Sequence, residues 1–356
     1  MKANRLKPLV IALVVAGAAG AVLADSKLGN FGAQGTKDKT ASPFGFAESG
    51  KKADRNATQP EDAGGKVIGG ELADEGEWPW QVALTVAAMP VSPDSQFCGG
   101  SLVMDEWVLT AAHCVHMMDD QGTEFDVHPT ELSIVAGTTK LDGSGDVIPV
   151  EAIFPHPSYT ATGLDYDIAL IKLARKPNVP YKTVEVPDAD FGDILQQPGV
   201  TTVVTGWGLQ NGGRMSPELR EVQIQMLDRE MCNTAMMEAR AEEAAAGFSY
   251  AAQVLSIAEN DAYALWDEML GRAPMPISEN MICSGTFEGG KTSCNGDSGG
   301  PLVVPLEDGS YIQAGIVSWG LSAASGQGCE ENAMFSAYTN ISAFIPWLNE
   351  VIASNP

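Results

Sequence analysis

Positive charge is scarce along this chain. Its 356 residues include 21 Lys and Arg against 46 Asp and Glu, a formal net charge of −25. Residues 1–66 hold 10 of the basic and 6 of the acidic side chains, which leaves 11 and 40 for residues 67–356. Binding to phosphates requires clustered Lys or Arg. The composition therefore argues against nucleic acid and anionic membranes as partners, and we interpret the acidic excess as a surface that keeps the protein soluble.

Metal-ligand patterns are missing as well. The chain has four histidines, and its His, Cys, Asp and Glu residues show no spacing typical of a metal site. Asp142 and Asp146 lie in a Gly-rich turn, but the EF-hand pattern is absent. We therefore expect no metal and no cofactor, and we interpret His116, His128 and His156 as ordinary loop or surface residues.

Long apolar runs are absent after the first 24 residues, so no membrane span is expected in the mature chain. Three basic residues among the first seven precede an apolar run at residues 9–22 that ends in small residues. This pattern predicts a secretory signal, residues 1–24, removed between Ala24 and Asp25. We therefore expect a secreted protein, or a periplasmic one in a bacterium, whose cysteines form disulfides. Residues 25–66 are polar without an apolar period and are expected to be a flexible pro-segment.

The remaining sequence is typical of a β-rich fold. Apolar residues make up 44% of the chain and 38 residues are glycine, as in loop-rich β proteins. Short β-type runs separated by turn residues predict a sandwich or a barrel. These runs are residues 80–86, 101–110, 132–136, 168–173, 201–205, 302–304 and 314–319.

Two segments have helical character. Residues 341–353 carry apolar side chains at helical spacing and predict a closing helix. Residues 234–272 are rich in Ala, Met and Glu and predict two or three helices, with possible breaks at Gly247 and Asn260. We expect the apolar side chains of this segment to pack against the rest of the fold or against one another. A role in substrate access is the alternative.

One turn presents a serine with little around it. Residues 296–301 are Gly-Asp-Ser-Gly-Gly-Pro, and the glycines leave room for a reacting carbonyl beside Ser298. A serine hydroxyl is a weak nucleophile without a base and an orienting acid. The candidate base is His113, within Thr-Ala-Ala-His-Cys, and the candidate acid is Asp167, before Ile-Ala-Leu, with Asp165 as its competitor. The order His, Asp, Ser is that of chymotrypsin-type triads.

These three motifs resemble those of the trypsin/chymotrypsin-like serine protease family, from about residue 67 onward. The resemblance implies a domain at 67–356 built from two six-stranded antiparallel Greek-key barrels, with the site between them and residues 174–188 connecting them. It implies a secreted, monomeric endopeptidase that acts on proteins and peptides and meets protein inhibitors. Two alternatives are weaker. An α/β-hydrolase needs a histidine after Ser298, and none follows; an inactive binding homologue usually lacks a triad side chain, and all three are present.

The resemblance also assigns a role to each residue of the site. Ser298 attacks the substrate carbonyl, His113 takes and returns the proton, and Asp167 orients His113. The backbone N–H groups of Gly296 and Ser298 form the oxyanion hole. Asp297 belongs to activation, described next.

The sequence Lys66-Val67-Ile68-Gly69-Gly70 is similar to the activation site of the family. Cleavage after Lys66 frees the α-ammonium of Val67, which is implied to form a buried ion pair with Asp297 and to order the oxyanion hole. The protein is therefore expected to be made as a zymogen that meets an activating protease.

Six cysteines allow fifteen pairings, and the sequence alone does not choose among them. The resemblance implies Cys98–Cys114, Cys232–Cys283 and Cys294–Cys329. The first pair lies beside His113, and the last beside the specificity pocket. The second encloses a helical insertion, about residues 234–275, in a loop that is usually short in the family.

The resemblance places Thr292 at the floor of the specificity pocket, where trypsin-like enzymes carry an aspartate. Because Thr292 is uncharged, we expect a chymotrypsin-like preference for apolar and aromatic residues, with elastase-like or residual trypsin-like specificity as the alternatives. Ser318, Trp319 and Gly320 are implied to pair with the substrate backbone, with Gly320 keeping the pocket open. Ala333 is implied to limit the depth of the pocket.

Overall fold

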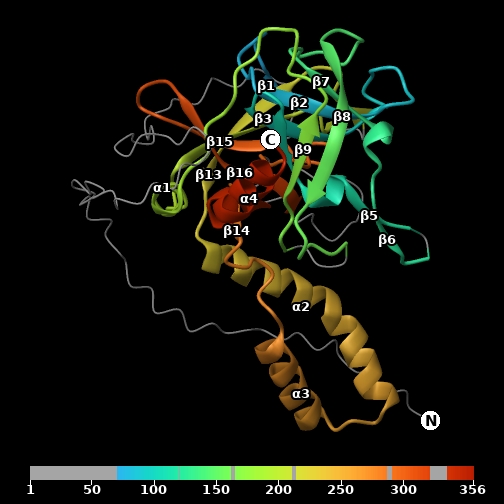
Figure 1. Ribbon diagram of the computed structural model, residues 1–356. Helices are drawn as coiled ribbons and strands as arrows, with labels where there is room; N and C mark the ends of the chain where they lie inside the picture. The colour runs from blue at the N-terminus through green and yellow to red at the C-terminus, as the bar shows by residue number, and fades with distance from the viewer. Residues whose placement is uncertain (1–69, 120, 162–164, 211–213, 287–290, 321–334) are drawn as a thin grey trace. The chain divides into compact units, whose positions relative to one another are not determined.

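The computed structural model describes residues 70–356 apart from residues 120, 162–164, 211–213, 287–290 and 321–334 (Figure 1). The expected signal and pro-segment, and also Lys66, Val67, Cys329 and Ala333, lie outside the described residues. The described chain divides into two compact units. Residues 237–274 form one unit, and the rest, with both barrels, forms the other.

The first barrel closes in the strand order β2-β3-β4-β9-β8-β7, with all neighbours antiparallel. Its interior is filled by fully buried Leu and Ile side chains, each of which stabilises the fold by about 1.5–3 kcal/mol. The strands are β2 (Gln81–Val86), β3 (Gln96–Met104), β4 (Trp107–Thr110), β7 (Leu132–Ala136), β8 (Asp146–Pro155) and β9 (Ala169–Leu173).

The second barrel follows the order β13-β10-β15-β16-β17-β14 and closes through the pairing of β13 with β14. A short strand, β1 (Glu71–Leu72), adds to β13 outside this ring. The predicted pair of six-stranded antiparallel barrels is therefore confirmed. The strands are β10 (Thr201–Gly206), β13 (Arg220–Met226), β14 (Met281–Gly285), β15 (Pro301–Pro305), β16 (Tyr311–Gly320) and β17 (Phe335–Asn340).

Shorter elements complete this unit. The closing helix is confirmed as α4 (Ile345–Ser354), which follows a 3-10 turn, η3 (Ile341–Phe344). The other elements are the hairpins β5 (His116–Met118) with β6 (Glu124–Asp126) and β11 (Leu209–Gln210) with β12 (Arg214–Met215), the turns η1 (Ala112–Cys114) and η2 (Pro129–Glu131), and helix α1 (Ala189–Leu195).

Two details differ from the sequence-based expectations. Residues 101–110, predicted as one strand, are parts of β3 and β4 joined at Asp105 and Glu106, because two exposed carboxylates form the turn there rather than lie in a buried strand. Helix α1 was not predicted. It begins where the Asp188 carboxylate accepts a hydrogen bond from Phe191 N at 2.8 Å, and it buries Phe191.

The predicted helical insertion is confirmed as two helices, α2 (Arg229–Val254) and α3 (Glu259–Arg272). Gly247 lies inside α2, and the chain turns at residues 255–258, where Ser256 adopts a left-handed conformation with φ 53°. Within the hairpin the rings of Phe248 and Trp266 pack at 4.9 Å between centroids. Other apolar side chains are exposed, notably Tyr250 at 71%.

The base of the insertion is fixed in the barrel unit. Cys232 and Cys283 form the predicted disulfide between α2 and β14. Next to it, Asn233 Nδ2 donates to Ile277 O at 3.0 Å, and Ile277 N donates to Asn233 Oδ1 at 2.8 Å. These buried contacts hold together the two ends of the segment that leaves the barrel.

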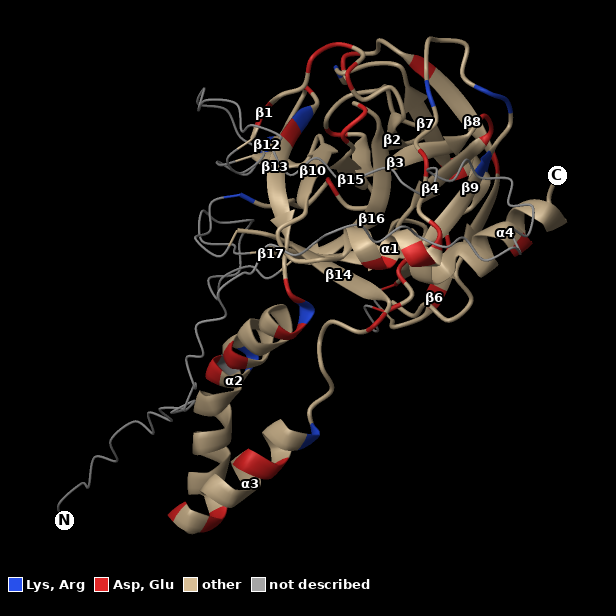
Figure 2. Ribbon diagram, turned by 90° about the vertical axis from the view of Figure 1, so that its left-hand side faces the viewer, with Lys and Arg blue, Asp and Glu red and all other residues tan. Residues whose placement is uncertain are grey.

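Figure 2 shows Asp and Glu distributed over the loops of the barrels and along both insertion helices, with fewer Lys and Arg. Among the described residues no helix is both long enough and apolar enough to cross a membrane.

Candidate active site

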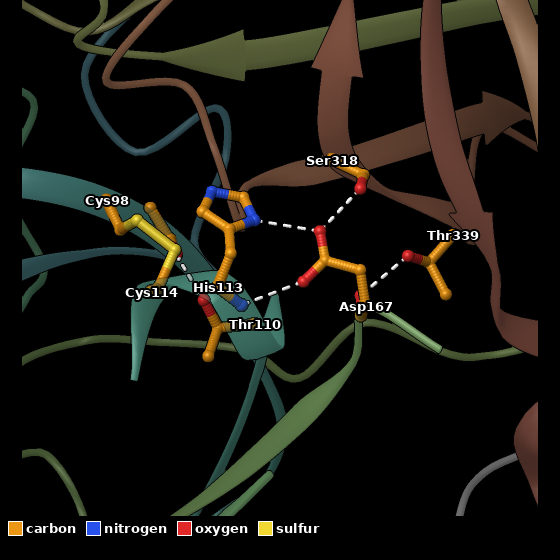
Figure 3. A network of polar contacts seen from close by, with 8 residues as sticks. Cys98, Thr110, His113, Cys114, Asp167, Ser318 and Thr339 are labelled. Carbon is orange, nitrogen blue, oxygen red and sulfur yellow. Dashed lines mark hydrogen bonds and ion pairs between the residues drawn. A yellow bond between two sulfur atoms is a disulfide. The ribbon is translucent and has the colours of Figure 1, made fainter. Parts of the chain in front are cut away.

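His113 and Asp167 meet because two neighbouring strands place them at the same end of the first barrel. His113 follows β4 in η1, Asp167 precedes β9, and the end of β4 pairs with the start of β9 through Thr110 and Ala169. Asp167 Oδ2 lies 2.8 Å from His113 Nδ1, and Asp167 Oδ1 accepts from His113 N at 2.8 Å (Figure 3). An ionised carboxylate only accepts hydrogen bonds, so Nδ1 carries the proton and Nε2 has a free lone pair.

The second barrel holds Asp167 from the other side. Ser318 Oγ, on β16, donates to Asp167 Oδ2, and Thr339 Oγ1, on β17, donates to the backbone oxygen of Asp167 at 2.6 Å (Figure 3). The competing acid, Asp165, instead accepts from Asn280 Nδ2 at 3.0 Å. The structure therefore favours Asp167 as the partner of His113, and Ser318 contributes to the acid as well as to the strand predicted to bind substrate.

Burial and charge act in opposite directions on this pair. Burial raises the pKa of Asp167, but the charge of His113 and the hydrogen bonds from His113 and Ser318 outweigh it, so the pKa lies below its ordinary 3.8. Burial lowers the pKa of His113, but the charge of Asp167 and its hydrogen bond outweigh this, so the pKa lies above 6.5. Asp167 therefore stays ionised and supports a positive charge on His113.

Ser298 lies in the turn that enters β15, and glycines bring this turn against the first barrel. Ser298 O accepts from Gly99 N at 2.7 Å. Gly299 has φ 77°, and a Cβ there would lie 2.6 Å from Gly99 O and 3.2 Å from Ala111 N, two residues before His113. Ser298 is partly exposed, and its hydroxyl has no hydrogen bond to His113 or to another residue within the described ranges.

Two backbone amides of the turn are left free. The N–H groups of Asp297, Gly299 and Gly300 donate to backbone oxygens at 2.8–2.9 Å. Those of Gly296 and Ser298 find no acceptor in the part of the chain that the structure describes. Amides that the fold does not use are available to bind an oxyanion. The free pair is the pair predicted for the oxyanion hole.

The direction of each free amide is set by the carbonyl in the same peptide plane. The plane that carries the Gly296 amide has the carbonyl of Asn295, which accepts from Leu209 N at 2.8 Å. The plane that carries the Ser298 amide has the carbonyl of Asp297, which accepts from Gly300 N at 2.9 Å. Because N–H and C=O of one plane point in opposite directions, fixing the oxygen also fixes the direction of the N–H.

Asp297 is buried beneath the turn. Its Oδ1 accepts from Gly208 N at 2.7 Å and its Oδ2 accepts from Cys294 N at 2.8 Å. Burial raises the pKa of Asp297 to about 6, although these two backbone hydrogen bonds lower it. No Lys, Arg or His of the described residues forms an ion pair with it. Its predicted partner, the α-ammonium of Val67, lies outside the described residues.

Thr292 belongs to a group of buried hydroxyls, which we name the hydroxyl cluster: Thr292, Ser293, Ser336 and Tyr338. Thr292 Oγ1 lies 2.6 Å from Ser336 Oγ, and Ser293 Oγ donates to Ser336 Oγ at 2.8 Å. The Tyr338 hydroxyl is buried and interacts with the hydroxyl groups of Ser293 and Ser336. None of the four side chains in the cluster is a basic or carboxylate group.

Ser336 was not predicted from the sequence. It lies opposite Gly320 in the pairing of β16 with β17, and a Cβ on Gly320 would come 3.1 Å from Ser336 Oγ. Ala333, predicted to limit the pocket, lies outside the described residues. The role of Ser336 follows from the register between β16 and β17. Residues 321–334 separate these strands in the sequence, so the sequence did not indicate this register.

The remaining predicted substrate residues lie at the end of β16. Trp319 is partly buried and packs against the cluster that contains Cys232, Met281 and Phe335, while Gly320 is exposed. An exposed strand end with a glycine can receive an extended peptide.

Disulfides brace the site. Cys98–Cys114 joins β3 to η1, directly after His113. Cys294 is disulfide-bonded as well, and its predicted partner, Cys329, lies outside the described residues. Among the described residues the one group close enough to hold a metal ion is Cys98, His113 and Cys114, and its two sulfurs are joined in the disulfide.

Comparison with known proteins agrees with this geometry. The family model described as "Trypsin" matches residues 67–348. Anionic trypsin of Canis lupus familiaris is 33% identical over 299 residues, which cover 83% of this chain and 93% of that protein. The Suppressor of tumorigenicity 14 protein homolog of Bos taurus is 30% identical over 81% of this chain, and Serine proteinase stubble of Drosophila melanogaster is 29% identical over 80%. The chain spans only 28% and 31% of the length of these last two. Two barrels, the match over most of the chain and a relative of nearly the same extent lead to one conclusion: the chain belongs to the trypsin family of serine proteases.

Proposed function

We propose that this trypsin-like serine peptidase is a secreted endopeptidase that cleaves peptide bonds through an acyl-enzyme on Ser298. The observation that carries the proposal is the His113–Asp167 pair beside a turn whose two free amides are those of Gly296 and Ser298. The signal-like start of the sequence supports secretion. Peptides and proteins are its substrates, and protein inhibitors are further partners.

The chemistry follows from the proton positions. Ser298 Oγ attacks the substrate carbonyl while His113 Nε2 takes its proton, because Nδ1 is already committed to Asp167. The negative charge that develops on the carbonyl oxygen is bound by the amides of Gly296 and Ser298, each worth about 3–4 kcal/mol. His113 then gives its proton to the leaving amine. Water attacks the acyl-enzyme by the same route and returns Ser298 to its starting state.

Substrate choice is proposed to follow the neutral hydroxyl cluster. A basic substrate side chain would lose water there without gaining a carboxylate, so uncharged apolar or aromatic residues are favoured before the cleaved bond. An elastase-like preference for small residues is the alternative, and residual trypsin-like cleavage is the weaker one. A cleavage profile on a mixed peptide library measures this directly. Dominant cutting after Lys or Arg would refute the assignment of Thr292.

Activation is proposed to occur by cleavage between Lys66 and Val67. The buried Asp297, with a raised pKa and no cationic partner among the described residues, supports this proposal because a new α-ammonium would complete an ion pair there. A neutral pocket disfavours self-cleavage after Lys66. A separate, trypsin-like activating protease is therefore expected.

Labelling tests the enzyme assignment against an inactive binding homologue. The processed protein is treated with a fluorophosphonate, which reacts with an activated serine, beside a Ser298→Ala control. We expect one label, lost in the control, and hydrolysis of chromogenic peptides that is lost with it. Absence of label from the processed protein would contradict the proposed function.

A further inference from the structure

Gln96 connects the first barrel to the turn that carries Ser298. It is the first residue of β3, its side chain is 4% exposed, and its Nε2 donates to Gly296 O at 2.8 Å across a sequence separation of 200 residues. The turn belongs to the second barrel, so this hydrogen bond joins the two barrels at the oxyanion site.

The bond holds the peptide plane between Gly296 and Asp297. This plane lies between the two planes that carry the free amides of the oxyanion hole. Its N–H donates to Cys294 O at 2.9 Å, and its oxygen accepts from Gln96. With both sides of the central plane held, the flanking amides of Gly296 and Ser298 keep one relative orientation.

Strand β3 holds the turn at a second point. Three residues after Gln96, Gly99 N donates to Ser298 O at 2.7 Å. The carbonyls of residues 296 and 298 are therefore both bound by β3, one by a side chain and one by the backbone. The amides of the same two residues are the free ones.

Gly296 needs such support. It has φ 93°, a left-handed conformation, and no side chain with which to restrict its rotation. A Cβ at this position would overlap Met215 and come 3.1 Å from Gly208 Cα, so a larger residue cannot supply the restraint. The restraint has to come from a neighbour.

The second atom of the Gln96 amide shows that this contact is not simply a gain in fold stability. Gln96 Oε1 is buried and accepts no hydrogen bond from the residues that the structure describes. An unpaired buried oxygen is unfavourable, and a leucine of similar size would fill the same space without it. The hydrogen bond from Gln96 Nε2 to Gly296 O accounts for an amide at this position.

We infer that Gln96 is a positioning residue for the oxyanion hole, acting through the Gly296–Asp297 peptide plane. The inference rests on the proposed function, because it concerns the oxyanion of the same reaction. Without the Gln96 bond the plane rotates more freely. The two amides then converge less often on the developing charge, which lowers the rate of the chemical step more than substrate binding.

The test compares Gln96→Leu, which removes the donor, with Gln313→Leu as a matched control. Gln313 is another buried glutamine, and its side chain accepts from Ser101 Oγ at 2.6 Å and donates to Gly315 O at 3.1 Å, both outside the turn. The processed enzymes are assayed with a peptide substrate for kcat and KM. Affinity is measured for a peptide boronate, whose tetrahedral adduct occupies the oxyanion hole, and for a cleaved peptide product.

We expect Gln96→Leu to lower kcat about 10- to 100-fold with KM changed less than about threefold. Boronate affinity should fall by a similar factor, and product affinity should stay near that of the parent. Gln313→Leu should lower thermal stability but leave kcat within about twofold. Equal losses of kcat in both variants, or a Gln96→Leu enzyme with unchanged kcat, would overturn the inference.

Gln96→Glu provides a second test that does not depend on the leucine variant folding well. A protonated carboxyl can donate to Gly296 O, whereas an ionised one only accepts and repels it. The activity of Gln96→Glu relative to the parent should therefore fall as pH rises. A ratio that is constant with pH would also overturn the inference. Failure of the proposed function is distinguishable, because the parent enzyme itself would then be inactive.

Discussion

Replacing Asp297 by Asn in the uncleaved protein should remove a pH dependence of stability. In the folded, uncleaved chain burial keeps the Asp297 carboxyl protonated up to about pH 6, against an ordinary pKa of 3.8. The folded state therefore binds more protons than the unfolded state between these values. The stabilisation from this group is present below pH 3.8 and is lost as pH rises through about 6.

The size of the effect follows from the pKa. Each pKa unit corresponds to about 1.4 kcal/mol, so a shift to about 6 corresponds to about 3 kcal/mol. We therefore compare the free energy of unfolding of the uncleaved parent with that of Asp297→Asn at each pH. The parent value minus the variant value should be about 3 kcal/mol lower at pH 7.5 than at pH 3.5. Any constant penalty of the Asn side chain, which presents an N–H to Gly208 N or Cys294 N, cancels in this difference.

The assay is urea unfolding followed by tryptophan fluorescence. Ser298→Ala is present in every sample, so that the protein does not digest itself. The first set also carries Lys66→Gln, so that its chain stays uncleaved. The free energy of unfolding is measured with and without Asp297→Asn at both pH values. A second set, with Lys66 intact and cleaved by added trypsin, carries the free Val67 ammonium. There the pairing lowers the pKa of Asp297, and the loss at pH 7.5 should disappear.

A difference between Asp and Asn that changes by less than about 0.5 kcal/mol with pH in the uncleaved set would refute the reasoning. It would mean that Asp297 ionises normally despite its burial. An equal pH dependence in the cleaved set would contradict pairing with Val67 instead.

Three further predictions concern single side chains. Asp167→Asn should lower kcat about 10,000-fold, and in the parent enzyme kcat/KM should rise with pH through a pKa above 6.5, because His113 must be neutral to act as a base. Thr292→Asp should raise kcat/KM for Lys and Arg substrates relative to Phe by about 100-fold, measured with matched chromogenic peptides. Burial and the charge of Glu77 raise the pKa of Glu221 to about 7, although a hydrogen bond from Trp78 lowers it. The stabilisation from the protonated carboxyl is present below its ordinary pKa of 4.5 and is lost as pH rises through about 7. The melting temperature of Glu221→Gln minus that of the parent should therefore be higher at pH 8 than at pH 5. A kcat/KM that does not change with pH would contradict the first prediction. The same ratio of Lys and Arg to Phe cleavage in parent and Thr292→Asp would contradict the second, and a melting-temperature difference that does not change with pH would contradict the third.

The sequence predicted those parts of the site that lie in short segments. His113, Asp167 and Ser298 each lie in a few characteristic residues, and their order indicated the family before any geometry was known. The strands were predicted because buried β-strands appear in the sequence as short β-type runs bounded by turn residues. The pairing of His113 with Asp167 was expected only through the resemblance, and the register of β4 with β9 gives its physical cause.

The residues that were not predicted depend on contacts between distant segments. Ser336 meets Thr292 across 44 residues of sequence, and Gln96 reaches Gly296 across 200 residues. Neither has a local signal, because a serine in a strand and a glutamine at a strand start are ordinary. Helix α1 is different: Asp188 after a proline is a recognisable N-cap, but seven residues are too few for a helical period to show.

The base of the insertion has a consequence for protein engineering. Cys232–Cys283 and the paired hydrogen bonds of Asn233 with Ile277 close the loop on the barrel side, and Met237–Pro274 forms a compact unit beyond them. These contacts on the barrel side do not involve residues 237–274. Residues 237–274 can therefore be replaced by a short linker, an affinity tag or a small foreign domain. The resulting proteases would share one active site and differ in the molecules that they bind.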